Sequence, residues 1–329
     1  MQSKCCLITG GAGFIGSHIV DAMLEAGWAV RILDPNCIGN PNLAHVASQV
    51  ELIDSDFGNQ TVAEVALKGV DALLHYASTT TPISANSNEI YDVESNLLNT
   101  LSLFHSAIKC GVSRLIFSSS GGTVYGPASE IPISEGHPCQ PISSHAIVKR
   151  AIESYIQLLS REHGLKYTIL RYANPYGPRQ KPDGAQGVIA VFAGKIMARQ
   201  PIDVWGDGSV IRDYIFIDDL VRATMMALNS DQAVNEIFNI GSGVGLSIRE
   251  IISLVEAITG IEAIENVHPA RIFDIPVNVL NIERATKKMS WVPMISMQEG
   301  LHRTLRWLDK YIQNNDFPLN KRNEGYVPS

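Results

Sequence analysis

The sequence lacks the features that mark exported, membrane-bound or nucleic-acid-binding proteins. It has no apolar run of membrane-spanning length and no dense run of lysine and arginine, and its formal net charge is −7 over 329 residues. Its five cysteines are odd in number and scattered, so they form neither a disulfide framework nor a metal-site spacing. These absences predict a cytoplasmic protein without a membrane anchor, a nucleic-acid partner or a bound metal.

Glycine, in contrast, is concentrated near the N-terminus, in the stretch Thr9-Gly10-Gly11-Ala12-Gly13-Phe14-Ile15-Gly16. Gly11, Gly13 and Gly16 match the spacing G-x-G-x-x-G, in which glycines allow a tight turn and a close approach of backbone to a pyrophosphate. The stretch follows an apolar strand predicted over 4–8 and begins a helix predicted over 14–25. The free N–H groups of such a helix N-terminus bind phosphate. This context predicts a dinucleotide-binding turn.

Asp34 supports the same interpretation. It ends a second apolar strand, predicted over 29–33, and lies about 20 residues beyond the glycine turn, where a carboxylate binds the ribose hydroxyls of the cofactor. A carboxylate there repels a 2′-phosphate, so NAD is favoured over NADP.

Strand-like and helical segments alternate along the first half of the chain, which predicts a parallel sheet covered by helices on both faces. Further strands are predicted over 50–53, 71–76, 114–118 and 167–171, and helices over 61–68, 88–109 and 144–163. The fold class is therefore α/β, a Rossmann-like doubly wound parallel sheet with a smaller C-terminal substrate domain. The NAD-binding domain is expected over 1–172, with segments near 213–243 returning to it. The substrate domain covers 173–212 and 244–313, and 314–329 is a tail.

Several ordered motifs identify the chain as similar to a known family. They are Thr9–Gly16, Ser118–Gly126, Leu170–Arg179, Gly206–Gly208, Arg212–Asp219 and Asn239–Gly243. The chain resembles the extended short-chain dehydrogenases/reductases, in their nucleotide-sugar epimerase branch. The resemblance implies an NAD-dependent 4-epimerase acting on a UDP-linked hexose or N-acetylhexosamine by transient oxidation at C4, as in polysaccharide biosynthesis. The expected cofactor-binding residues are Gly10, Gly13, Phe14, Ile15, Gly16, Asp34, Asp56, Ala77, Lys149 and Tyr172.

The sequence departs from the family at the catalytic position. Family members carry a Tyr and a Lys four residues apart, which share one helix face. Here Lys149 is present, but the Tyr position is His145, and none of the ten tyrosines is followed by Lys at the fourth residue. A neutral imidazole can accept a proton near pH 7. We expect His145 to carry the proton, through a shifted sugar or one bridging water. The assisting hydroxyl is that of Ser120 or of Thr123, depending on the alignment.

The resemblance also implies substrate-binding residues. Asn96 and Asn174 match positions near the sugar, and Arg212 and Arg271 match a pair that binds the diphosphate, for which guanidinium groups are suited. Asn278 stands where galactose-specific members carry a bulky Tyr. A smaller residue there resembles members that admit an N-acetyl group at C2.

Two other functions remain open from the residues alone. The chain could bind NAD and a UDP-sugar while being silent or very slow, with a regulatory or assembly role, or it could be a nucleotide-sugar reductase or dehydrogenase. A 4,6-dehydratase is disfavoured, because such members carry Asp-Glu after their Thr whereas this loop reads Gly121-Gly122-Thr123. Relatives dimerise through helices corresponding to 88–109 and 144–163, which implies a homodimer.

Overall fold

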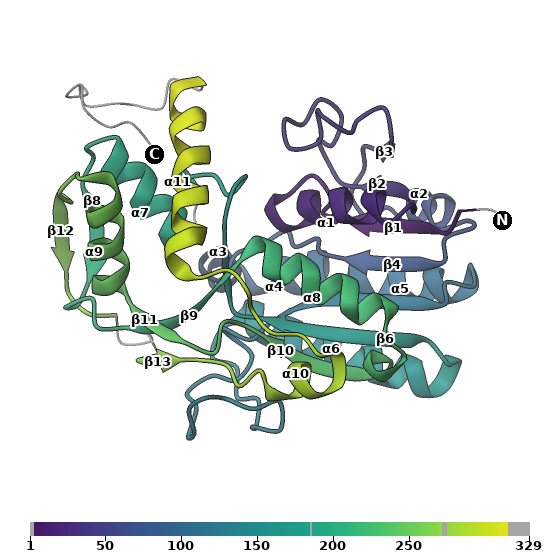
Figure 1. The fold of residues 1–329 in the computed structure, drawn as a ribbon. Coiled ribbons are helices and arrows are strands. Elements are labelled where there is room, and N and C mark those ends of the chain that lie inside the picture. Colours follow the sequence, from purple (N-terminus) through teal and green to yellow (C-terminus); the bar gives the residue numbers. More distant parts are fainter. Residues whose placement is uncertain (1–2, 185, 272–274, 315–329) are drawn as a thin grey trace.

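The computed structural model of this chain describes residues 3–184, 186–271 and 275–314. The predicted tail, apart from its first residue, lies outside the described residues. The described chain folds into two lobes with the larger one at the N-terminal end of the sequence (Figure 1).

The larger lobe is built on a seven-stranded parallel sheet with the order β10-β6-β5-β4-β1-β2-β3. Its strands are β1 (Cys5–Thr9), β2 (Ala29–Leu33), β3 (Glu51–Ile53), β4 (Ala72–His75), β5 (Arg114–Ser120), β6 (Lys166–Tyr172) and β10 (Glu236–Ile240). The predicted Rossmann-like fold is confirmed, and each predicted strand is found within about two residues of its expected bounds.

Helices cover both faces of this sheet, because successive side chains of each strand point to opposite faces. In β1, Cys6 and Ile8 pack into one core and Leu7 into the other. The first core includes α1 (Phe14–Glu25) and α8 (Ile217–Asn229), which lie side by side in front of the sheet in Figure 1. The second includes α2 (Gln60–Ala66), α5 (Asn99–Lys109) and α6 (Ser144–His163).

The helix predicted over 88–109 is less regular than expected. It consists of α4 (Glu89–Asp92), a π-helical segment η1 (Val93–Leu98) and α5. Asp92 and Asn96 are buried polar residues here, and their side chains bond to neighbouring segments. A π turn is rare and occurs frequently at functional sites. The irregularity coincides with the two buried polar side chains, Asp92 and Asn96.

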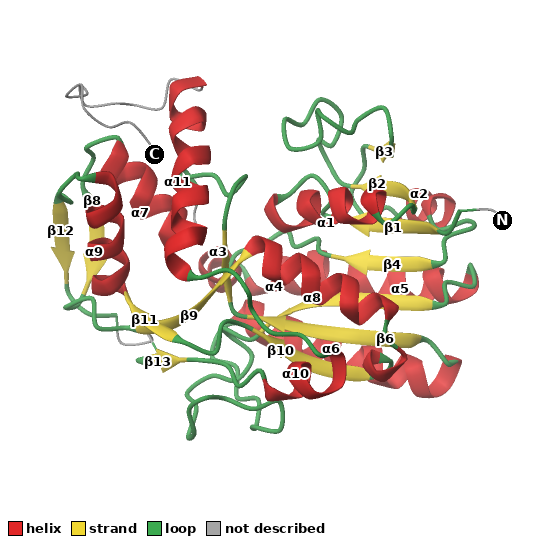
Figure 2. Ribbon diagram, in the orientation of Figure 1, coloured by secondary structure: helices red, strands yellow, loops and turns green. Residues whose placement is uncertain are grey.

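The smaller lobe contains two short sheets. One has the order β11-β9-β13 with β7 also paired to β9, and the other pairs β8 with β12. These strands are β7 (Asn174–Tyr176), β8 (Ile202–Trp205), β9 (Ile211–Phe216), β11 (Gly245–Ser247), β12 (Glu265–His268) and β13 (Val277–Asn278), and the helices are α7 (Val188–Met197), α9 (Ile248–Thr259) and α11 (Met297–Asn314) (Figure 2). Three short helical segments complete the described fold: α3 (Pro82–Ser87), η2 (Asp231–Ala233) and α10 (Glu283–Met289).

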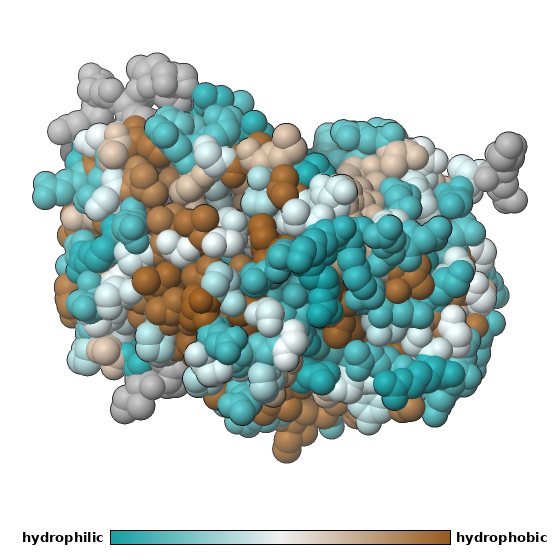
Figure 3. All heavy atoms as spheres, turned by 60° about the horizontal axis from the view of Figure 1, so that its bottom comes forward, coloured by the Kyte–Doolittle hydropathy of each residue, from teal (hydrophilic) through white to brown (hydrophobic). Residues whose placement is uncertain are grey.

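The surface differs between the lobes. On the face shown in Figure 3, hydrophobic residues gather over the smaller lobe on the left, and hydrophilic residues dominate the right-hand part over the larger lobe. None of the described helices is both long enough and apolar enough to cross a membrane.

The segment predicted to return to the larger lobe, 213–243, is divided between the lobes. Strand β9 belongs to the sheet β11-β9-β13 of the smaller lobe, whereas α8 and β10 belong to the larger lobe. The exact domain boundaries stay a prediction.

Candidate active site

The glycine turn connects β1 to α1 and comes too close to other backbone for side chains. A Cβ added at Gly16 would stand 2.0 Å from the carbonyl oxygen of Gly10, and one at Gly10 would stand 2.7 Å from the amide nitrogen of Ala77. Gly10 has a φ of 73°, which favours glycine. Gly13 precedes α1, and no side chain caps this N-terminus. The turn therefore leaves helix N–H groups free for phosphate, as the fingerprint predicts.

Two carboxylates lie beside this turn at the ends of β2 and β3. Asp34 Oδ2 accepts a hydrogen bond from Ala12 N at 2.9 Å, and Asp56 Oδ1 accepts one from Gly58 N at 2.6 Å. Burial raises the pKa of Asp34, the bond from Ala12 lowers it, and Asp56 is among the charges that raise it. Asp34 therefore both fixes the turn and presents a carboxylate next to it. Asp34, Asp56 and Ala77 do not line the main cavity described next.

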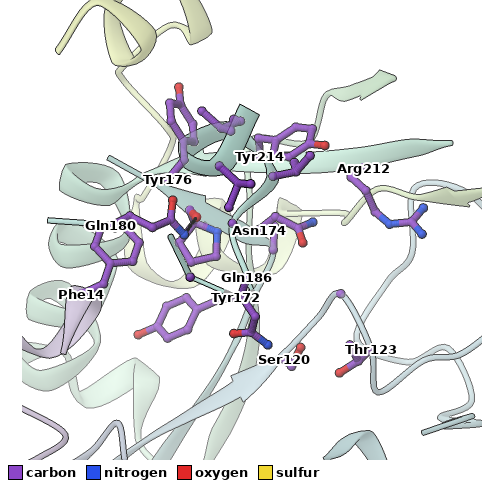
Figure 4. Close-up of a pocket in the computed structure, with 18 of the residues that line it drawn as sticks. Phe14, Ser120, Thr123, Tyr172, Asn174, Tyr176, Gln180, Gln186, Arg212 and Tyr214 are labelled. Carbon is purple, nitrogen blue, oxygen red and sulfur yellow. Dashed lines mark hydrogen bonds between the residues drawn. The ribbon is translucent and has the colours of Figure 1, made fainter. Parts of the chain in front are cut away.

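A cavity of about 860 Å³ lies where the strand ends of the large sheet face the smaller lobe (Figure 4). This is the position at which open α/β sheets bind ligands. It brings together most of the residues expected from the sequence: Gly10, Gly13, Phe14, Ile15, Gly16, Ser120, Thr123, His145, Lys149, Tyr172, Asn174, Arg212 and Arg271. Segments that are far apart in the chain thus form one site.

Helix α6 places His145 and Lys149 on the wall of this cavity, four residues apart. Ser143 caps the helix, its Oγ accepting a hydrogen bond from Ala146 N at 3.4 Å. Lys149 is buried, donates from Nζ to Ser118 O at 2.9 Å, and lies 5.0 Å from the centre of the Phe117 ring.

At pH 7 the environment leaves the imidazole neutral and the lysine mostly cationic. Burial lowers the pKa of His145 to about 4, with Lys149 acting in the same direction and Asp92 opposing it. Burial also lowers the pKa of Lys149 to about 8, although Asp92 and Glu153 raise it. At pH 7 His145 is therefore a proton acceptor, and most of Lys149 carries a positive charge. Burial is thus a larger cause of the lowered His145 pKa than the positive charge of Lys149.

Several buried polar atoms at the cavity have no partner among the described residues. They include Thr123 Oγ1, the Tyr214 hydroxyl and Gln180 Oε1, and all three residues line the cavity. Buried polar groups are nearly always hydrogen-bonded, so these atoms indicate a polar ligand. Figure 4 shows Ser120 and Thr123 next to each other at the lower side of the cavity, facing Asn174 and Tyr214 above them. Both candidate hydroxyls are thus placed to contact the same ligand.

Two arginines approach the cavity from the smaller lobe. Arg212 Nη1 donates to Ile211 O at 2.9 Å and to Ile275 O at 2.6 Å. The Arg271 guanidinium lies 3.9 Å from the centre of the Trp205 ring, and His268 stacks on the same indole at 4.6 Å. Sequence reasoning missed Trp205, Tyr214 and Gln180. Two of them could have been found from their positions in the sequence: Trp205 directly precedes the Gly206–Gly208 motif, and Tyr214 lies two residues after Arg212.

The three asparagines are placed differently. Asn174 Nδ2 donates to Asp213 O at 2.8 Å on the cavity wall. Asn96 is buried and does not line the cavity; its Oδ1 accepts from Thr79 N at 2.9 Å. Asn278 is 1 % exposed, donates from Nδ2 to Gly121 O at 3.2 Å, and is also outside the cavity lining. The roles assigned to them stay predictions.

Comparison with known proteins agrees with this geometry. The family model described as "NAD dependent epimerase/dehydratase family" matches residues 6–241. A putative UDP-glucose 4-epimerase of Methanocaldococcus jannaschii is 35% identical over 303 residues, covering 92% of this chain and 97% of the relative.

Two solved structures have the same fold. One is a UDP-glucose 4-epimerase with UDP-glucose from Thermotoga maritima, with a TM-score of 0.88, 34% identity, and coverage of 94% of this chain and 99% of that one. The other is a UDP-N-acetylglucosamine 4-epimerase from Methanobrevibacter ruminantium in complex with UDP-N-acetylmuramic acid, with a TM-score of 0.87, 28% identity, and coverage of 94% and 100%.

Proposed function

Because this chain belongs to the NAD-dependent epimerase/dehydratase family and its cofactor is NAD, we propose that it is a UDP-sugar 4-epimerase with His145 as proton carrier. The observation that carries this proposal is the position of His145 and Lys149 on one wall of the cavity that also contains the glycine turn. NAD supplies reversible hydride transfer at C4 of the sugar. The protein has to hold both ligands and move one proton.

The residues around the turn fit the cofactor. The close approach of Gly16 to Gly10 leaves no room for a side chain, and the uncapped α1 offers N–H groups to the diphosphate. The Asp34 carboxylate suits ribose hydroxyls and disfavours a 2′-phosphate. Lys149 suits a nicotinamide ribose, in line with its family role.

At the sugar, the neutral imidazole of His145 accepts the proton of the C4 hydroxyl, directly or through one water, and later returns it to the same C4 oxygen, when hydride would come back to the opposite face of the sugar. Burial, together with the positive charge of Lys149, keeps the imidazole neutral between turnovers. The hydroxyl of Ser120 or Thr123 assists by bonding the same oxygen. Arg212 and Arg271, which both line the cavity, bind the diphosphate through their guanidinium groups.

The test is proton NMR of the purified protein, without added cofactor, incubated separately with UDP-glucose and UDP-N-acetylglucosamine. We expect the galacto epimer to form from at least one sugar. The variant His145→Phe should retain bound NAD and lose 10²- to 10⁴-fold in kcat, the usual contribution of a general base. His145→Tyr is the matched variant, because it restores the family residue and should be active.

The outcomes separate the alternatives. If neither sugar reacts with the native protein but both bind and His145→Tyr is active, the native chain is a binding relative. If His145→Phe is as active as the native protein, histidine is not the proton carrier. Net reduction that consumes a stoichiometric amount of bound cofactor would instead indicate a reductase. The identity of the sugar that reacts also tests the prediction that Asn278, which is smaller than Tyr, accompanies a substrate with an N-acetyl group at C2.

We further propose a homodimer. Large apolar side chains are exposed on α4, η1 and α6, which contact one another: Ile90, Tyr91, Val93, Leu98, Ile147, Tyr155 and Leu158. An apolar patch of this kind marks an interaction site, and the family resemblance suggests a second copy as its partner. Light scattering of the purified protein at micromolar concentration should give twice the mass of 35.9 kDa, and Tyr155→Glu should shift it toward the monomer. A monomeric native protein would overturn this proposal. The expected cytoplasmic location stays a prediction.

A further inference from the structure

Asp92 is a buried carboxylate next to the catalytic helix that neither the family motifs nor the proposed function uses. It is the last residue of α4, and it is fully buried. Its Oδ1 accepts hydrogen bonds from Thr80 Oγ1 at 2.6 Å and from Asn96 Nδ2 at 2.8 Å, and its Oδ2 accepts one from Ser144 Oγ at 2.7 Å. In the described part of the chain, no cation lies within 4 Å of it. A buried carboxylate held only by neutral donors is costly, which points to a role for Asp92 beyond packing.

The three donors connect Asp92 to the parts of the fold that form the site. Thr80 lies in the loop after β4 and lines the cavity, Asn96 lies in the π turn η1, and Ser144 is the first residue of α6, directly before His145. The amide of Asn96 also donates to Thr80 Oγ1 at 2.9 Å, so both of its N–H groups are fixed. The π turn therefore serves to bring Asp92 and Asn96 to the start of the catalytic helix.

Charge balance at the site indicates what the carboxylate does. The charged groups that act on His145 are Lys149, which disfavours a protonated imidazole, and Asp92, which favours it. When the imidazole takes a proton from the sugar hydroxyl, a second positive charge appears beside Lys149. Among the described residues, Asp92 is the negative charge that acts on His145 and can offset it.

We propose that Asp92, held in place by Ser144, is a positioning residue that stabilises His145 in its protonated state during turnover. This inference rests on the proposed role of His145 as proton carrier. It assigns to Asp92 an effect on kcat and not on the binding of UDP-sugar, because the carboxylate does not line the cavity.

The experiment measures steady-state kinetics and pH profiles of the NAD-bound protein with the UDP-sugar that the native protein epimerises. Asp92→Asn should lower kcat 10- to 100-fold and leave KM within about twofold. It should also shift the alkaline limb of kcat/KM, set by Lys149 with a pKa of about 8, to lower pH, since Asp92 raises that pKa. The matched control is Glu94→Gln, the same change at an exposed carboxylate in η1, which should alter neither kcat nor the profile.

A double-mutant cycle separates this role from a purely structural one. If Asp92 acts through His145, Asp92→Asn should have no further effect on the residual rate of His145→Phe. An equal loss of kcat in both backgrounds, or an unshifted alkaline limb, would overturn the inference. If Asp92→Asn does not fold, Ser144→Ala takes its place: it keeps the carboxylate but frees Oδ2, and should lower kcat 3- to 10-fold only when His145 is present. The proposed function fails separately, through a fully active His145→Phe.

Discussion

The two sides of the cavity are held by different kinds of interaction. On the cofactor side, backbone lies against backbone: Gly16 and Gly10 approach so closely that a Cβ at Gly16 would stand 2.0 Å from the Gly10 carbonyl oxygen. On the proposed substrate side, the wall consists of side chains such as His145, Thr123 and Arg271, which come from helices and loops of both lobes. At the glycine turn on the cofactor side, we expect that no atom can be added to the glycines, whereas changes in side-chain chemistry are tolerated. On the substrate side, we expect small changes of side-chain volume to be tolerated but changes of side-chain charge to be harmful.

The largest effect is expected beneath the substrate side, where α6 is fixed to the sheet by a buried ion pair. Arg171 Nη2 donates to Glu153 Oε2 at 2.6 Å, and both side chains are almost fully buried. Glu153→Gln leaves a buried unpaired guanidinium, so the free energy of unfolding should fall by about 3–5 kcal/mol. Denaturant titration measures this. Glu283→Gln, which breaks an exposed pair with Lys287, is the control and should cost under about 0.5 kcal/mol.

Next comes the cofactor side. Gly16→Ala forces a methyl group into the Gly10 carbonyl, so we expect a loss of about 3 kcal/mol in stability together with loss of co-purified NAD. Differential scanning calorimetry and the absorbance of released cofactor provide the two measurements. Gly136→Ala is a matched control because its Cβ would meet nothing closer than 3.8 Å. Full NAD content in Gly16→Ala would show that the turn is looser than its backbone geometry indicates.

A smaller effect, confined to the substrate side, is expected for Arg271→Ala. The loss of charge-assisted hydrogen bonds to the diphosphate should raise KM for the UDP-sugar about 10- to 100-fold and leave NAD content unchanged. Arg249→Ala removes an arginine of the same lobe that pairs with Glu265 outside the cavity, and it should leave KM as it is. A loss of NAD in Arg271→Ala would mean that the two sides of the cavity are not independent.

The smallest expected effect distinguishes two hydroxyls within the substrate side. Of the variants Ser120→Ala and Thr123→Val, the one that removes the assisting hydroxyl should lower kcat about tenfold, and the other should change it less than about twofold. The unpartnered, buried Oγ1 of Thr123 favours Thr123. Single-turnover rates of the purified variants decide the question, and equal losses in both would contradict a single assisting group.

The sequence predicts features that depend on neighbouring residues better than features that depend on contacts between distant segments. The strands were found because β1, β4 and β5 are apolar runs buried on both faces. The glycine turn was found because its spacing reflects local steric limits. The helix predicted over 88–109 contains a π turn that the sequence did not indicate. At this turn Asp92 and Asn96 bond to residues of other segments, such as Thr80 and Ser144.

By itself, then, the sequence determined the α/β fold, and it predicted the glycine turn for NAD and a histidine at the family's catalytic position, because each depends on residues close together in the chain or on an ordered motif. Only the tertiary structure decided that Asp92 contacts Ser144, that Arg271 lies on Trp205, and that Thr123 and Tyr214 present unpartnered polar atoms to one cavity. These contacts join segments that are far apart in the chain. They therefore depend on how the elements pack within each lobe and around the cavity.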